Sequence, residues 1–222
     1  MTRLAAPLVL LIALAAGCAS KPPPPQWRMD AHDAAERATQ AYLSGDSRVA
    51  ALEWTRARAE VSRTGRPELL ARLELMRCAA EVASLQATGC PAFEALRADV
   101  GDPELLAYAD YLAGRPSEAA LLPPAQRAAA AGGEAAIAAV ADPLARLVAA
   151  GAAVQAGRAT PRLLALAADT ASEQGWRRPV LAWLLAGEQQ ARAAGDAALA
   201  QALRRRIAVV ESAGAPPAAP AH

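Results

Sequence analysis

Apolar side chains recur three and four positions apart through most of the chain, the spacing that places them on one face of a helix. The segments 68–85, 161–174 and 178–194 show this spacing most plainly. No run alternates Val, Ile or Thr with polar residues, as a half-buried strand would. Alanine, the strongest helix former, dominates the composition, and aromatic residues make up only 4% of the chain. Pattern and propensity together predict an all-α protein.

Glycine, proline and capping residues mark where the helices begin and end. Helices are predicted over 30–44, 46–63, 68–85, 92–98, 103–112, 126–131, 134–140, 143–155, 161–174, 178–194 and 197–211, with a capping residue followed by proline at 102–103, 142–143 and 160–161. Asp30 or Asp33 is expected to cap the first helix. Met76, Leu185 and Leu199 are expected to face inward on their helices.

Residues 30–64 contain two amphipathic helices separated by Gly45-Asp46, and Asp46 can cap the second helix. Ala50, Trp54 and Ala57 are spaced by four and three positions, so they lie on one helix face. Small residues on that face allow two helices to approach closely, and the tryptophan fills the space to a neighbouring helix.

This helix–turn–helix resembles a tetratricopeptide repeat. The matching positions are a small residue of the first helix, the turn, and the small–aromatic–small face of the second helix: Ala38; Tyr42, Gly45 and Asp46; Ala50, Trp54 and Ala57. The chain departs from the family at Ala34 and Arg37, where Trp and Leu are usual, and its closing proline is displaced to Pro67. The segment 111–114 echoes 42–45 and is interpreted as a degenerate second repeat. The resemblance implies antiparallel hairpins stacked as a degenerate α-solenoid over residues 30–212, with an extended binding surface.

The first part of the chain has the layout of a secretory signal peptide. Arg3 is the only charge before Cys18, and Leu4–Ala16 is apolar but shorter than the roughly 20 residues of a membrane-spanning helix. Pro22–Pro25 follow and favour a stiff polyproline spacer. The predicted organisation is a signal peptide over 1–17, a tether over 18–29, the helical domain over 30–212 and a disordered Ala/Pro-rich tail over 213–222.

The segment Leu14-Ala15-Ala16-Gly17-Cys18 resembles a bacterial lipobox, although Ala15 stands where the family usually has Leu. The resemblance implies cleavage before Cys18 and acylation of its thiol and its new amino group, so that the membrane is one partner. Ala19, rather than aspartate, follows the cysteine, and the family's sorting tendency then favours the periplasmic face of the outer membrane. The alternative is an ordinary cleaved signal with an incidental cysteine.

Cys78 and Cys90 are the remaining cysteines, and two cysteines in an oxidising compartment suggest a disulfide. That bridge requires the helix carrying Cys78 to end near Ser84, so that 85–89 can turn back and bring the two Cα atoms within about 7 Å. The alternative is two buried free thiols.

The charge balance offers no reason to expect a nucleic-acid partner. The formal net charge is +1, and removal of Arg3 with the signal leaves 22 basic and 22 acidic residues. Two arginine clusters, 177–178 and 204–206, could form a basic patch for phospholipid, or they could be a solvated helix flank with carboxylate partners.

Motifs that would indicate catalysis are missing from the sequence. It has no Gly-x-Ser-x-Gly elbow, phosphate-binding loop or dinucleotide fingerprint, so neither an enzyme nor a cofactor is expected. His32 shares a helix face with Glu36, but no second histidine or cysteine pair supports a metal site, and none is expected. Glu53 is interpreted as a surface residue that pairs with neighbouring arginines such as Arg56 and Arg58.

Stacked hairpins on a lipid anchor suggest a non-catalytic scaffold or adaptor that binds a protein partner in the cell envelope. The architecture loosely resembles two groups of lipoproteins with tetratricopeptide folds, the pilotins and the helical lipoprotein of the barrel-assembly machine. The alternative is an envelope lipoprotein that binds or cleaves glycans with a pair of carboxylates.

Overall fold

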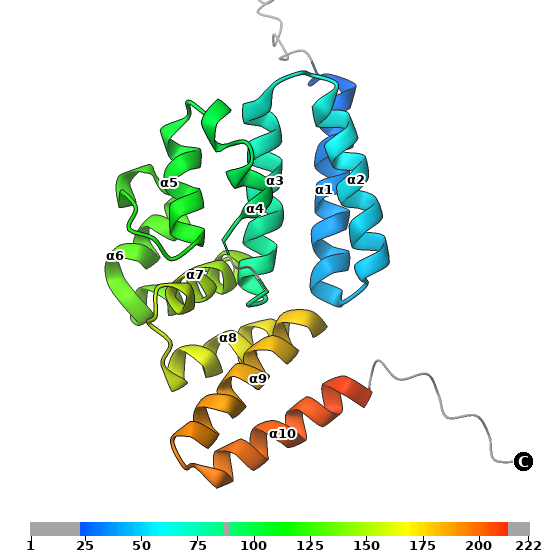
Figure 1. Cartoon of the computed structure of the whole chain (residues 1–222). Coiled ribbons are helices and arrows are strands. Elements are labelled where there is room, and N and C mark those ends of the chain that lie inside the picture. Colours follow the sequence, from blue (N-terminus) through cyan, green and yellow to red (C-terminus); the bar gives the residue numbers. More distant parts are fainter. Residues whose placement is uncertain (1–22, 87–88, 213–222) are drawn as a thin grey trace, which may run out of the picture.

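The computed structural model of the chain describes residues 23–86 and 89–212. All regular structure in these ranges is helical, which confirms the all-α prediction (Figure 1). Successive helices form antiparallel hairpins that stack on one another in a solenoid-like array. The predicted signal peptide, the lipidation site Cys18 and the tail over 213–222 lie outside the described residues.

α1 (Gln26–Ser44) and α2 (Ser47–Ser62) form the first hairpin. The predicted tether over 18–29 is wrong at its end, because the helix already begins at Gln26. Pro25 stands at the N-cap with φ −54°, a value that its ring fixes and that suits the approach to a helix. Asp30 and Asp33 therefore lie inside α1, where neither can cap it.

α3 (Pro67–Ala83) lies at the centre of the array. The first hairpin packs on one side of α3, and α5 and α7 pack on the other (Figure 1). Four short elements follow it in the sequence: α4 (Pro91–Glu94), the 3-10 turn η1 (Arg97–Asp99), α5 (Pro103–Leu112) and the 3-10 turn η2 (Ala119–Leu121). The inward prediction for Met76 is wrong: it is 41% exposed, because partners on two sides still leave a solvent stripe along α3.

α6 (Pro124–Ala138) and α7 (Pro143–Gln155) make the next pair. Gly133 interrupts α6 with φ +66° and ψ −152°, at the break that the sequence predicted between 131 and 134. α7 crosses α3 closely at Gly151, where an added Cβ would collide with the carbonyl of Val82. Only glycine permits this approach, which brings α7 against the end of α3.

α8 (Pro161–Glu173), α9 (Arg177–Ala193) and α10 (Ala197–Ser212) complete the array. Trp183 of α9 is fully buried, and its Nε1 donates a hydrogen bond of 2.9 Å to the carbonyl of Ala83 at the end of α3. Leu185 and Leu199, predicted to face inward, are 45% and 41% exposed. Leu185 lies away from the buried stripe of α9. α10 packs mainly on α9, so much of the surface of α10 stays open.

Two separate clusters of buried side chains stabilise the array. The smaller one joins the first hairpin to the start of α3 and includes Ala34, Ala38, Trp54, Ala57 and Leu73. The larger one extends from α3 through α9 and reaches Ile207 of α10. The first hairpin therefore shares with α3 a small core that is separate from the larger cluster.

Candidate binding groove

A groove of about 320 Å³ opens between α2 and α3, and α9 contributes a residue at one end. Its apolar floor consists of Ala50, Ala51, Trp54 and Leu73. Small residues at 50 and 51 leave the depression open, because a larger side chain on α2 would fill it. We call this feature the α2–α3 groove; it is lined by three of the residues predicted for the repeat, Tyr42, Ala50 and Trp54.

The predicted repeat residues lie together in the first hairpin. Ala38 and Ala57 are fully buried where α1 meets α2, Ala50 is 3% exposed, and Trp54 is 8% exposed. The alanines let the two helix backbones approach, and the Trp54 ring then packs toward Leu73 and the start of α3. The same tryptophan thus belongs to the core and to the floor of the groove.

The turn at Gly45-Asp46 sets the geometry of the hairpin. Gly45 has φ +96°, a conformation that L side chains rarely adopt. The Asp46 carboxylate accepts a 3.0 Å hydrogen bond from the amide of Val49 and caps α2, as the sequence predicted. Its own amide donates to the carbonyl of Ala41 at 2.8 Å, which closes the end of α1.

Arg178 of α9 reaches the turn of the first hairpin, 136 residues earlier in the chain. Its Nε donates to the carbonyl of Tyr42 at 2.7 Å, and a terminal nitrogen donates to Ser47 Oγ at 2.7 Å. The guanidinium also lies 4.3 Å from the centre of the Tyr42 ring. Burial raises the pKa of Tyr42, and the Arg178 charge offsets part of that rise. This contact closes one end of the groove.

Ion pairs lie along the two walls. Arg58 of α2 donates to Glu74 of α3, and Arg77 donates to Glu81 at 3.0 Å on α3. The arginine side chains are about half exposed, 51% and 50%, whereas Glu74 is only 5% exposed. Both carboxylates of the groove are therefore ion-paired, and in each pair the arginine is the more exposed partner.

The prediction that Glu53 is a surface residue is wrong. Its side chain is 6% exposed and lies between α1 and α2. Arg37 of α1 pairs with it at 3.1 Å and Arg56 at 2.8 Å, whereas Arg58 pairs with Glu74. A buried carboxylate needs such partners, since an unpaired charge there would be strongly destabilising.

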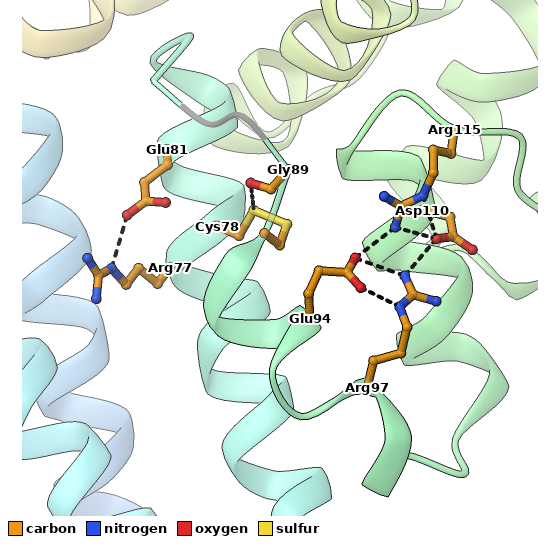
Figure 2. Close-up of a disulfide and its surroundings, with 9 residues drawn as sticks. Arg77, Cys78, Glu81, Gly89, Glu94, Arg97, Asp110 and Arg115 are labelled. Carbon is orange, nitrogen blue, oxygen red and sulfur yellow. Dashed lines mark hydrogen bonds and ion pairs between the residues drawn. A yellow bond between two sulfur atoms is a disulfide. The ribbon is translucent and has the colours of Figure 1, made fainter.

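A disulfide joins Cys78 of α3 to Cys90, which stands just before α4; the two sulfur atoms lie 2.04 Å apart and the Cα atoms 5.6 Å apart (Figure 2). α3 ends at Ala83 with Ser84 as its C-cap. Leu85 follows with φ +54°, so the chain turns back there. The helix thus ends near Ser84, as a bridge between these two cysteines requires.

An ionic cluster that the sequence pattern did not indicate lies close to this disulfide (Figure 2). Arg97 donates to Glu94 at 2.6 Å and to Asp110 at 2.7 Å, and Arg115 donates to the same two carboxylates at 2.8 and 2.6 Å. Hydrogen bonding from Arg97 lowers the pKa of Glu94. The spacing of Glu94 and Arg97 was a signal for one pair, but nothing local indicated that α5 would complete the cluster.

In the described part of the chain, the histidine and the arginine clusters singled out from the sequence do not form a metal site or a free basic patch. Within 23–86 and 89–212, no group of three or more His, Cys, Asp or Glu side chains could hold a metal ion, and exposed His32 lies 3.2 Å from Glu36. Three arginines of the two clusters have partners here: Arg177 donates to the Val210 carbonyl, Arg204 pairs with Glu188, and Arg206 pairs with Asp169.

Among the described residues, no single helix has both the length and the apolar composition to cross a membrane. α6 and α7 would pass that test only as a pair, and they are bent by 110° relative to each other.

Comparison of the chain with models of protein families, with curated proteins and with solved structures finds no significant match in any of the three. The resemblance to a tetratricopeptide repeat therefore rests on the residues of the first hairpin alone.

Proposed function

We propose that this chain is a lipoprotein, anchored through acylated Cys18 to the periplasmic face of the outer membrane, whose helical domain binds a protein partner without catalysing a reaction. The anchor is supported by the lipobox-like segment 14–18. The binding role is supported by one observation above the others, the α2–α3 groove, which is open to solvent and lies between the repeat-like hairpin and α3.

Two features make this groove suitable for a polypeptide. Its floor is apolar, so it can bury side chains of a partner, and its polar groups stand along the walls. Its carboxylates, Glu74 and Glu81, are both ion-paired with arginines. An adaptor of this kind needs a shaped surface rather than a free acid or base.

The anchor is tested by fractionation of cells that express Cys18→Ser. The variant is expected in the periplasmic fraction, whereas the unaltered chain is expected in outer membranes with an acylated residue 18 detectable by mass spectrometry. As a matched control, Ala19→Asp keeps the acylated cysteine and is expected to move the chain to the inner membrane. A Cys18→Ser chain that still fractionates with outer membranes would rule out the lipid anchor.

The binding role is tested by a photo-crosslinking amino acid placed at Thr55, an exposed position that lines the groove. Irradiation of intact cells is expected to give one dominant crosslinked protein. The same amino acid at Ala208, exposed on α10, is the control and should not give that product. Identical products from both positions would mean that the groove is not the binding surface.

A further inference from the structure

The acidic and basic side chains of the α2–α3 groove differ in how deeply they are buried. Glu74, at 5% exposure, and Glu81, at 24%, lie low in the groove, while Arg58 and Arg77 are about half exposed above them. Arg178 adds a third guanidinium at the end nearest the turn. A ligand that enters from solvent therefore meets arginines before it meets carboxylates, and the lining carries one more positive than negative charge.

The apolar floor limits what kind of anion fits. Between the arginines the groove presents Ala51 and Thr55, both exposed, above the Trp54 ring. From Ser47 to Arg58 the α2 wall rises by eleven residue steps, or about 17 Å at 1.5 Å per step. An extended peptide advances about 3.3 Å per residue, so roughly five residues would fill this length.

From this arrangement we propose that the groove recognises an extended, acidic segment of a protein, about five residues long, in which carboxylates alternate with apolar side chains. The carboxylates meet Arg58, Arg77 and Arg178, and the apolar side chains contact the floor at Ala51 and Trp54. Alternation follows from extended geometry, because successive side chains point to opposite sides. This inference rests on the proposed function and specifies its partner.

Arginine suits this role because its planar guanidinium can keep one carboxylate and still donate to another. Arg58 and Arg77 already hold Glu74 and Glu81, and both arginine side chains remain about half exposed. The internal pairs fix the arginine side chains in place, so less side-chain entropy is lost when the peptide binds.

The experiment measures binding of fluorescent peptides to the full chain in neutral detergent. One peptide alternates glutamate with leucine, and the other alternates lysine with leucine. Ala51→Glu places in the groove a negative charge, like that of the glutamate peptide, without breaking an ion pair. Ala51→Arg places a positive charge at the same position, and Ala208→Glu adds the negative charge outside the groove. Circular dichroism checks that each variant is folded.

We expect the glutamate peptide to bind and the lysine peptide not to bind. Ala51→Glu should weaken binding about tenfold, Ala51→Arg should not weaken it, Ala208→Glu should leave it unchanged, and added salt should weaken it, because exposed charges are screened. Equal binding of both peptides, no binding of either, or indifference to Ala51→Glu would overturn the inference.

Anionic lipid is the competing source of negative charge. Vesicles of phosphatidylglycerol and of phosphatidylcholine are therefore tested beside the peptides. Binding to phosphatidylglycerol that depends on Ala51, without binding to the glutamate peptide, would overturn the inference in favour of a lipid surface. If the Thr55 crosslink in cells persists when no acidic peptide binds, the adaptor function stands and only the acidic partner is rejected.

Discussion

Replacing Trp183 with phenylalanine tests a contact between α9 and the end of α3. The indole Nε1 donates to the carbonyl of Ala83, at the end of α3 and 100 residues earlier in the chain. Both Trp183 and Ala83 are fully buried, so no water can replace the lost donor. Trp183→Phe keeps an aromatic ring in the core and removes this donor.

The expected loss of unfolding free energy in Trp183→Phe has two parts. An unsatisfied buried carbonyl costs about 1–3 kcal/mol, and the smaller ring adds a cavity term. For a domain of this size, 1 kcal/mol corresponds to about 2–4 °C in melting temperature. A loss of about 2 kcal/mol therefore predicts a decrease of about 4–8 °C for Trp183→Phe. Trp183→Ala should lose about 3–5 kcal/mol from the removed ring, in addition to the hydrogen bond.

Thermal unfolding followed by far-ultraviolet circular dichroism measures this decrease. Trp27→Phe is the matched control, because Trp27 is only partly buried at the start of α1 and should change little. A Trp183→Phe chain that melts at the same temperature as the unaltered chain would show that the bond to Ala83 does not stabilise the array.

Three further predictions follow from the structure. Trp54→Ala should destabilise the fold by about 3–5 kcal/mol, because the ring is 8% exposed in the smaller core, and urea unfolding measures the loss; an unchanged midpoint would contradict its place there. Replacing Cys78 and Cys90 together by serine should lower the free energy of unfolding by about 3 kcal/mol, since the disulfide between residues 12 positions apart closes a short loop. Reductant should lower the stability of the unaltered chain by the same amount and leave the double variant unchanged. Burial raises the pKa of Tyr111 to about 12, above its ordinary value of 10. The protonated hydroxyl therefore contributes its full stability below about pH 10, and this contribution is lost as the pH rises from 10 through 12. Tyr111→Phe should flatten this decline in stability when unfolding is measured at alkaline pH.

Local signals predicted the helix ends well where a side chain caps its own helix. Asp142 accepts from the amide of Ala145 before α7, and Thr160 accepts from that of Leu163 before α8, as their positions before proline indicated. The start of α1 was misplaced because no side chain caps it; Pro25 stands at the N-cap instead.

The first hairpin was predictable for the same reason. Ala38, Trp54 and Ala57 are set by helical spacing, and Gly45 by the backbone conformation of one turn. Helical spacing also places Glu53 on the buried face of α2, three positions after Ala50 and four before Ala57. Its partner Arg37 was not predictable, because Arg37 belongs to another helix. The sequence showed that a disulfide requires α3 to end near Ser84, but only the fold shows that Cys90 lies beside Cys78.

The sequence by itself determined the helical class and the capped turns, because these depend on residues within one or two helical turns of each other. It also carried the lipobox-like segment on which the proposed anchor rests. Only the tertiary structure decided which helices meet across the array: Arg178 on the Tyr42 turn, Trp183 on Ala83, and α7 on α3 at Gly151. These contacts join residues 69 to 136 positions apart, and no helical period relates their side chains. The α2–α3 groove belongs to this second group, because α2 and α3 form its walls and α9 closes one end.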